Sequence, residues 1–179
     1  MAEFSTTPLH HIDYPVAAPD GSGVCALSAP IEDVPEEHLW TVLINKAFHP
    51  DLYIPMKAVT TRTNADGSIW RKMHFDPSKL GMDIPAGPGR PLIEVITVDK
   101  DSGIIKFVVV DEEDKPTGEV HFNILHREPY RIETSKCGPD GKKVLLNDGT
   151  PVQTQIAEAR LLATGASLKE AVQFVPRRY

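Results

Sequence analysis

From about residue 57 to residue 146, apolar and β-branched positions fall in short runs separated by turn residues. The runs are MKAVTTRT, IWRKMHF, LIEVITV, IIKFVVV and EVHFNILH, followed by YRIETSK and KKVLL. The intervening segments include NADGS, DKDSG and EEDKPTG. Short runs bounded by Gly, Pro, Asn and Asp are typical of strands joined by turns. The pattern predicts an antiparallel meander of six or seven strands.

The segments on either side of the meander have helical periodicity. In EDVPEEHLWTVLINKAF, apolar residues recur near the 3.6-residue period until HPDLYIP interrupts them. Asp33 and Glu36 have capping-box spacing and Pro35 suits a first turn, so we expect a helix near 35–47. Its apolar stripe is Leu39, Val42, Leu43 and Phe48, widened by Trp40 and Ile44.

The C-terminal helix is predicted in VQTQIAEARLLAT, near 153–164. Gly165 is the expected C-cap, and Ser167 with Glu170 forms a second capping box that begins SLKEAVQFV. Before the meander, GVCALSAPI is expected to be a short strand. The order of strand, helix, long meander and helix predicts an α+β fold in which helices cover one face of a curved antiparallel sheet.

The run LWTVLINKAFHPDLYIPM…VTTRTNADGSIWRKMHF…LIEVITVDKDSGIIKFVVV…GEVHFNIL resembles the START-like superfamily, also called SRPBCC or helix-grip. It is most similar to polyketide cyclase-like and uncharacterised small members, over roughly residues 23–175. The resemblance implies a seven-stranded sheet that grips a C-terminal helix around an internal cavity for an apolar small molecule. The chain departs from the pattern in a proline-rich N-terminal segment, in LLNDGTP and at Gly165.

Domain organisation follows from the length of 179 residues, which suits one domain with its own core. Residues 1–22 contain three prolines and PDGSG without regular periodicity, so we expect an N-terminal arm followed by a single START-like domain over 23–179.

Composition and charge exclude several partner classes. Apolar residues make up 41% and charged residues 25%, as in ordinary globular proteins, and the net charge of −6 argues against a nucleic-acid partner. No apolar run is long enough to span a membrane and no signal peptide is visible, so we expect a cytoplasmic protein. Cys25 and Cys137 have no metal-binding spacing and are expected to be reduced thiols, with no metal and no cofactor.

Strand alternation selects one polar pair. In IWRKMHF, Arg71 shares a face with Met73 and Phe75, and in LIEVITV, Glu94 lies on the matching face of the next strand. A buried guanidinium needs a partner, so we expect an Arg71–Glu94 pair inside the sheet. It would serve as a polar anchor or an acid/base pair for a ligand, or as a structural ion pair.

The segment HFNILHREPYR carries two further histidines. Because Val120, Phe122, Ile124 and His126 form the more apolar set, they are expected to face the cavity, which leaves His121 and Asn123 facing solvent. The two histidines then lie on opposite faces and cannot share a metal. Tyr130, next to Pro129, is expected at a bend or strand edge near the ligand.

These patterns give one candidate site and three hypotheses for its function. The catalytic candidates are Arg71, Glu94 and His126, and the ligand-binding candidates are Met73, Phe75, Phe107, Phe122, Ile124 and Tyr130. The first hypothesis is an enzyme of the cyclase, isomerase or dehydratase type acting on a polyketide or similar hydrophobic metabolite. The alternatives are a non-catalytic carrier or sensor of a lipid or metabolite, and a co-chaperone-like module; a homodimer stays open.

Overall fold

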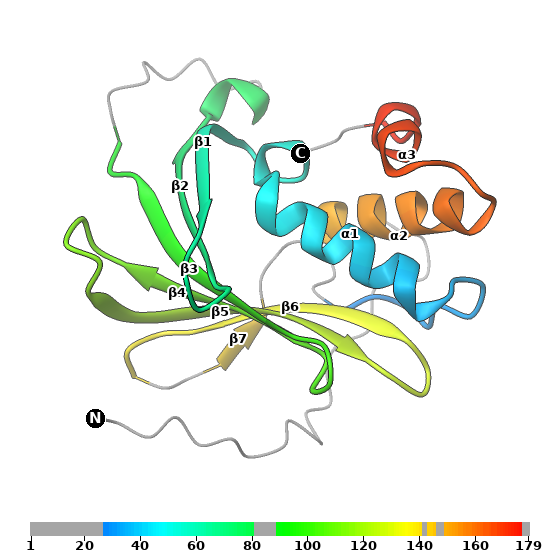
Figure 1. Cartoon of the computed structure of the whole chain (residues 1–179), viewed down its shortest axis with the longest axis horizontal. Helices are drawn as coiled ribbons and strands as arrows, with labels where there is room; N and C mark the ends of the chain where they lie inside the picture. The colour runs from blue at the N-terminus through cyan, green and yellow to red at the C-terminus, as the bar shows by residue number, and fades with distance from the viewer. Residues whose placement is uncertain (1–26, 81–88, 141–142, 146–148, 177–179) are drawn as a thin grey trace.

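Seven antiparallel strands form one sheet in the order of the chain, β1 to β7, in the computed structural model (Figure 1). The structure describes residues 27–80, 89–140, 143–145 and 149–176, so the predicted arm lies outside the described residues. The strands are β1 Met56–Thr63, β2 Ile69–Phe75, β3 Leu92–Asp99, β4 Ile104–Val110, β5 Pro116–His126, β6 Arg131–Cys137 and β7 Lys143–Leu145. The predicted meander is confirmed.

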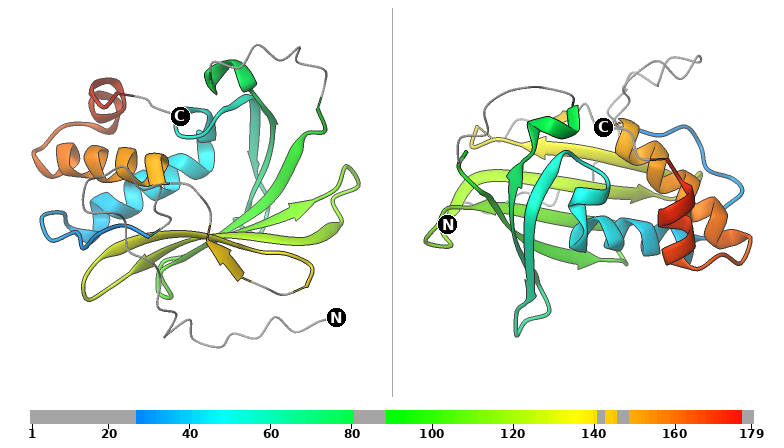
Figure 2. Two further views of the ribbon diagram at one scale, coloured as in Figure 1. Left: turned by 180° about the vertical axis from the view of Figure 1, so that it is seen from behind. Right: turned by 90° about the horizontal axis from the view of Figure 1, so that it is seen from above.

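The helices lie on one face of this sheet, as Figures 1 and 2 show from three directions. Helices α1 (Glu36–Phe48) and α2 (Gly149–Ala163) pack against each other, and α3 (Leu168–Phe174) follows α2. Two short 3-10 helices, η1 (Pro50–Leu52) and η2 (Pro77–Leu80), precede β1 and follow β2. The predicted α+β class, a curved antiparallel sheet with a helix from the C-terminal region on its inner face, is confirmed.

The core lies between α1, α2 and the inner face of the sheet. Its residues come from alternate positions of five strands and from the apolar stripes of the helices: Ile69, Ile96, Ile105, Phe107, Leu125 and Ile132 from the sheet, and Leu39, Val42, Leu43, Val152, Ile156 and Ala159 from the helices. Alternation along β2 and β3 therefore follows the prediction, because each strand turns every second residue toward the core. A register irregularity in β1 between Lys57 and Thr60 accompanies the bend of the β1–β2 hairpin (Figure 1).

The two helix-start predictions have different outcomes. Ser167 and Glu170 form the predicted capping box of α3. The Asp33–Glu36 box is wrong: Pro35 is the N-cap of α1 and no side chain caps it. Both carboxylates bind arginines instead, Asp33 to Arg160 and Glu36 to Arg127.

The predicted N-terminal strand is much shorter than expected within the part that the structure describes. Leu27 forms an isolated bridge with Glu133 of β6, and Ile31 forms one with Tyr130, the residue before β6. No helix in the described part of the chain is both long enough and apolar enough to cross a membrane.

Gly103, in the β3–β4 turn, provides a test of this architecture. Its φ is +76°, and an added Cβ would lie 2.6 Å from the backbone oxygen of Leu125 in β5. Gly67, in the β1–β2 turn, has a similar φ of +83° with nothing within 4 Å of an added Cβ. We expect Gly67→Ala to cost about 1–2 kcal/mol from the left-handed backbone alone, and Gly103→Ala to cost clearly more. Urea unfolding measures both costs. Equal costs would contradict the close approach of the β3–β4 turn to β5.

Candidate functional site

A buried ion pair crosses the inner face of the sheet between β2 and β3. Arg71 and Glu94 are direct cross-strand partners and are only 3% and 1% exposed. The Arg71 Nε donates to Glu94 Oε2 at 3.1 Å, and Nη2 donates to the same oxygen at 2.5 Å. The structure thus brings together the two residues that alternation and the need for a buried partner predicted.

Arg71 also binds the C-terminal end of α1. Its Nη1 donates to the backbone oxygens of Lys46 and Ala47 at 3.1 and 2.9 Å. Carbonyls in the last helical turn lack partners within the helix and carry the negative end of its dipole, so a cation is favoured there. The guanidinium carbon also lies 5.2 Å from the centre of the Phe107 ring. Arg71 therefore joins a helix end to two strands.

His121 of β5 extends this pair toward the surface. Its Nδ1 lies 3.3 Å from Glu94 Oε1, and its Nε2 lies 2.6 Å from Oε1 of Glu119. The side chain of His121 is 21% exposed and that of Glu119 is 39% exposed. Arg71, Glu94, His121 and Glu119 thus form a chain of alternating charge from the core to solvent.

The two titratable groups in the middle of this chain are perturbed in opposite directions. Burial lowers the pKa of His121, but its hydrogen bonds to Glu94 and Glu119 outweigh burial and hold that pKa above its ordinary value. Burial raises the pKa of Glu94, but the charge of Arg71 and the contacts with His121 outweigh it and hold that pKa below its ordinary value. The charged form of each side chain is therefore favoured by the other.

A cavity of about 300 Å³ opens beside this chain of charges. It lies between the C-terminal end of α1, the segment that leads into β1, and strands β2 to β5. The described residues that line it are Lys46, Ile54, Pro55, Met56, Arg71, Met73, Phe75, Leu92, Glu94, Phe107, His121 and Asn123. The lining is largely apolar with a few polar groups on one wall, which is the usual composition of a small-molecule site.

Among the described residues that line the cavity, Asn123 is the one with a buried side-chain donor that forms no hydrogen bond. Asn123 is 4% exposed, and its Nδ2 has no hydrogen-bond partner. A buried polar atom without a partner costs about 1–3 kcal/mol, so such atoms are rare and call for an explanation. Thr134, Ser135 and Gln155, which do not line the cavity, also carry buried side-chain atoms without a hydrogen-bond partner, so the unpaired amide alone does not mark a site.

Five of the predicted site residues line this cavity: Arg71, Glu94, Met73, Phe75 and Phe107. Phe122, Ile124 and His126 do not, and the prediction that they face it is wrong. They lie on the opposite face of β5, because Phe107 and Ile105 of the core pair with His121 and Asn123. His126 Nε2 instead lies 2.8 Å from Oε2 of buried Glu133.

The error on β5 has a physical cause. Val120 and Ile124, on the outer face, are as well buried as the core residues, so hydrophobicity alone did not distinguish the two faces. His121 and Asn123, predicted to face solvent, line the cavity instead. The signal that could have shown this was Glu94. A buried carboxylate accepts several hydrogen bonds, and a histidine two strands away on the same face can donate one of them.

Tyr130 lies elsewhere. It precedes β6, packs against the core, and its hydroxyl donates to Glu36 Oε2 at 3.2 Å. It is not among the residues that line the cavity.

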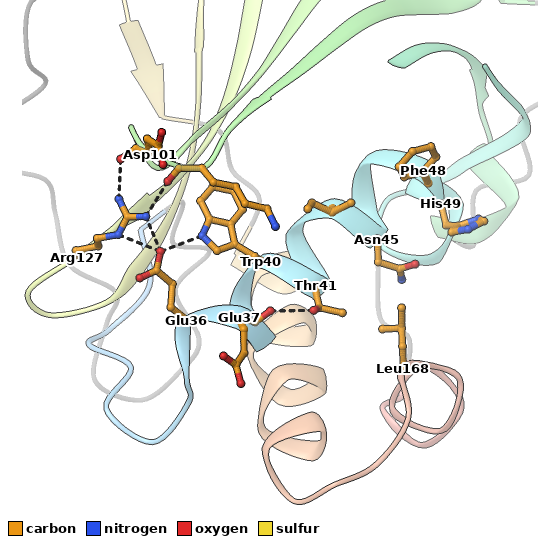
Figure 3. Close-up of a pocket in the computed structure, with 12 residues that line it drawn as sticks. Glu36, Glu37, Trp40, Thr41, Asn45, Phe48, His49, Asp101, Arg127 and Leu168 are labelled. Carbon is orange, nitrogen blue, oxygen red and sulfur yellow. Dashed lines mark hydrogen bonds and ion pairs between the residues drawn. The ribbon is translucent and has the colours of Figure 1, made fainter. Parts of the chain in front are cut away.

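A second, larger hollow of about 730 Å³ runs along the outer side of α1 (Figure 3). At one end, Arg127 donates to Glu36 Oε1 and to the backbone oxygens of Lys100 and Asp101, and the Trp40 indole donates to the same Glu36 oxygen. The hydrogen bonds from Arg127 and Trp40 lower the pKa of Glu36 to about 2. These polar groups satisfy one another, so they fasten the β3–β4 turn to α1 rather than offering free donors or acceptors.

Comparison with known proteins adds one structural likeness. No family model matches the chain, and no curated protein matches it. The structure is similar to that of the Zhui aromatase/cyclase from Streptomyces sp. R1128, with a TM-score of 0.40 and 17% sequence identity, over 80% of this chain and 90% of that one. A likeness of this degree carries no conclusion about what this chain binds.

Other site classes find less support. Among the described residues, no three His, Cys, Asp or Glu side chains are grouped so that they could hold a metal ion. Cys137 is a free thiol, and Cys25 lies outside the described residues.

The first prediction from the site concerns the buried pair. Glu94→Leu should lower the free energy of unfolding by about 3–5 kcal/mol, because it leaves the buried Arg71 charge half-paired. Adding Arg71→Met should recover only part of this, since the Lys46 and Ala47 carbonyls then lose their donors. Glu113→Leu, which removes an exposed partner of Lys115, is the control and should change little. A double variant as stable as the wild type in urea would show that the helix contacts of Arg71 contribute nothing.

The second prediction concerns His121 and pH. Because its folded-state pKa is raised, protonated His121 contributes stability that is fully present below the ordinary value of 6.5 and is lost as the pH rises through the folded value. We expect the unfolding free energy to fall as the pH rises above 6.5, and His121→Gln to flatten this decline. His74→Gln, on the other face of β2, is the matched control. If the unfolding free energy of His121→Gln declines with pH as steeply as that of the wild type, protonated His121 does not stabilise the fold.

Proposed function

We propose that this chain binds a small, largely apolar molecule in the cavity beside Arg71, Glu94, His121 and Asn123. The observation that carries the proposal is a cavity of about 300 Å³ whose lining is largely apolar and includes these four polar side chains. The apolar walls would bury most of such a molecule, while the polar side chains would orient it.

The size of the cavity limits the ligand. At about 300 Å³ it lies at the small end of ligand-binding cavities, so a molecule of one or two rings fits better than a large lipid. Phe75, half exposed at the edge of the cavity, and Leu92 supply apolar surface where such a ring system would enter. This favours binding of a small metabolite over lipid transport.

A second candidate function is proton-transfer catalysis of the cyclase, isomerase or dehydratase type on such a molecule. His121 favours it, because a histidine held between Glu94 inside and Glu119 at the surface can exchange a proton with solvent. Arg71 and Glu94 would then be positioning residues, and His126, on the other face, would have no part. The carrier or sensor hypothesis uses the same cavity without turnover.

Binding can be tested with 2-acetylnaphthalene, a fluorescent two-ring ketone. We expect saturable binding at one site per chain, reduced at least tenfold in Leu92→Trp, which places an indole in the cavity. Val98→Trp is the matched control, because Val98 lies on the same strand but is exposed and outside the lining. Thermal melts establish that both variants fold. Unchanged binding in a folded Leu92→Trp, or no saturable binding at all, would contradict the cavity as the site.

A further inference from the structure

The charged side chains of the cavity wall are bound to one another and to the backbone. Arg71 donates four hydrogen bonds, two to Glu94 Oε2 and one each to the backbone oxygens of Lys46 and Ala47. Glu94 Oε1 lies 3.3 Å from His121 Nδ1, so both oxygens of this carboxylate already face a donor. An incoming ion would have to compete with these contacts before it could form its own.

His121 adds a second balanced pair to this wall. When it is protonated, both ring nitrogens are donors, and both face carboxylates, because Nδ1 faces Glu94 and Nε2 lies 2.6 Å from Glu119 Oε1. Arg71, Glu94, His121 and Glu119 then hold two positive and two negative charges. Lys46, the other charged residue among the described lining residues, is 6% exposed and also has an interaction partner.

The uncharged polar groups of the wall offer a ligand little more. The backbone oxygens of Ile54 and Pro55 accept from the backbone N–H groups of Met56 and Asp76, each at 2.7 Å. Asn123 has a buried Nδ2 without a partner, and its Oδ1 has no donor among the described residues. An amide can add a hydrogen bond to a ligand, but it has no net charge that could balance an ion.

The rest of the described lining is apolar and includes Met73, Phe75, Leu92 and Phe107. An apolar ligand gains from burial against these side chains. A carboxylate or an ammonium ion of the same shape would lose its hydration in the cavity, and this cost is large unless an opposite charge replaces the water. Since the charges of the wall are already paired, nothing offsets the cost.

We infer that this cavity binds uncharged molecules and excludes carboxylates and ammonium ions of the same shape, because the charged side chains of its wall are paired with one another. The inference rests on the proposed function and specifies its ligand class as a neutral aromatic or alicyclic compound, such as a ketone, an alcohol or a hydrocarbon. The ionisable residues of the wall thus hold the strands and α1 together instead of binding an ion.

Three naphthalenes of similar shape separate the possibilities: 2-acetylnaphthalene, 2-naphthoate and 2-naphthylmethylammonium. Their dissociation constants are measured by fluorescence titration at pH 6.5. We expect the neutral ketone to bind at least tenfold more tightly than either ion. An ion that binds as tightly as the ketone, or more tightly, would overturn the inference while leaving the cavity as a binding site. Absence of binding by all three would contradict the proposed function itself.

A variant that unpairs the wall tests the cause. Glu94→Gln removes the carboxylate that balances Arg71, so the affinity for 2-naphthoate should rise at least tenfold relative to that for the ketone. Glu113→Gln makes the same change in an exposed pair with Lys115 and should keep the wild-type preference.

A second variant applies if Glu94→Gln does not fold. Leu92→Lys adds an unpaired cation to the lining and should likewise favour 2-naphthoate at least tenfold relative to the ketone. Val98→Lys, at an exposed position of the same strand, is its control. A folded Glu94→Gln or Leu92→Lys that keeps the wild-type preference for the ketone would overturn the inference.

Discussion

The Arg71 guanidinium is the interaction on which the arrangement of helix, sheet and cavity depends. It is buried, it binds Glu94 across β2 and β3, and it binds the last carbonyls of α1. Helix ends and buried carboxylates each need a donor, and the planar fork of arginine supplies several in fixed directions. One side chain therefore fixes where α1 ends relative to the sheet, and the cavity opens next to that helix end.

The register of the sheet extends this constraint to the part of the cavity wall that β5 forms. Glu94 uses its second oxygen for His121, which places a histidine of β5 against a carboxylate of β3. On β4, which lies between these strands, Val109 pairs with Glu94 and Phe107 pairs with His121. Since both neighbours of His121 are acids, its cationic form is stabilised inside an otherwise apolar face. Asn123, two residues along, is left with an unused donor beside a stabilised cation. The residues that pair across the strands thus also line the cavity.

Local sequence patterns predicted most of the fold, because turn residues and apolar periodicity are local properties. The runs MKAVTTRT and IWRKMHF correspond to β1 and β2 as the structure has them, and the Ser167–Glu170 box was correct. Half of the polar site was predictable as well, since buried Arg71 required an acid on the neighbouring strand. The faces of β5 were not predictable, because Val120 and Ile124 are buried on the outer face. The contribution of Lys46 and Pro55 to the cavity lining was not predictable either, because it depends on long-range packing.

The contrast between the two hollows shows why size alone does not identify a site. The larger one, along α1, has Arg127, Glu36 and Trp40 at one end, and these groups complete one another's hydrogen bonds. The smaller one keeps a donor unpaired in a place that water reaches poorly, at a cost to the stability of the empty protein. A fold gains nothing in stability from such a cost, whereas a binding site recovers it when its ligand arrives. The unpaired Asn123 amide, more than the volume around it, is therefore what distinguishes the cavity beside Arg71 from the larger hollow, whose described lining residues include no such atom.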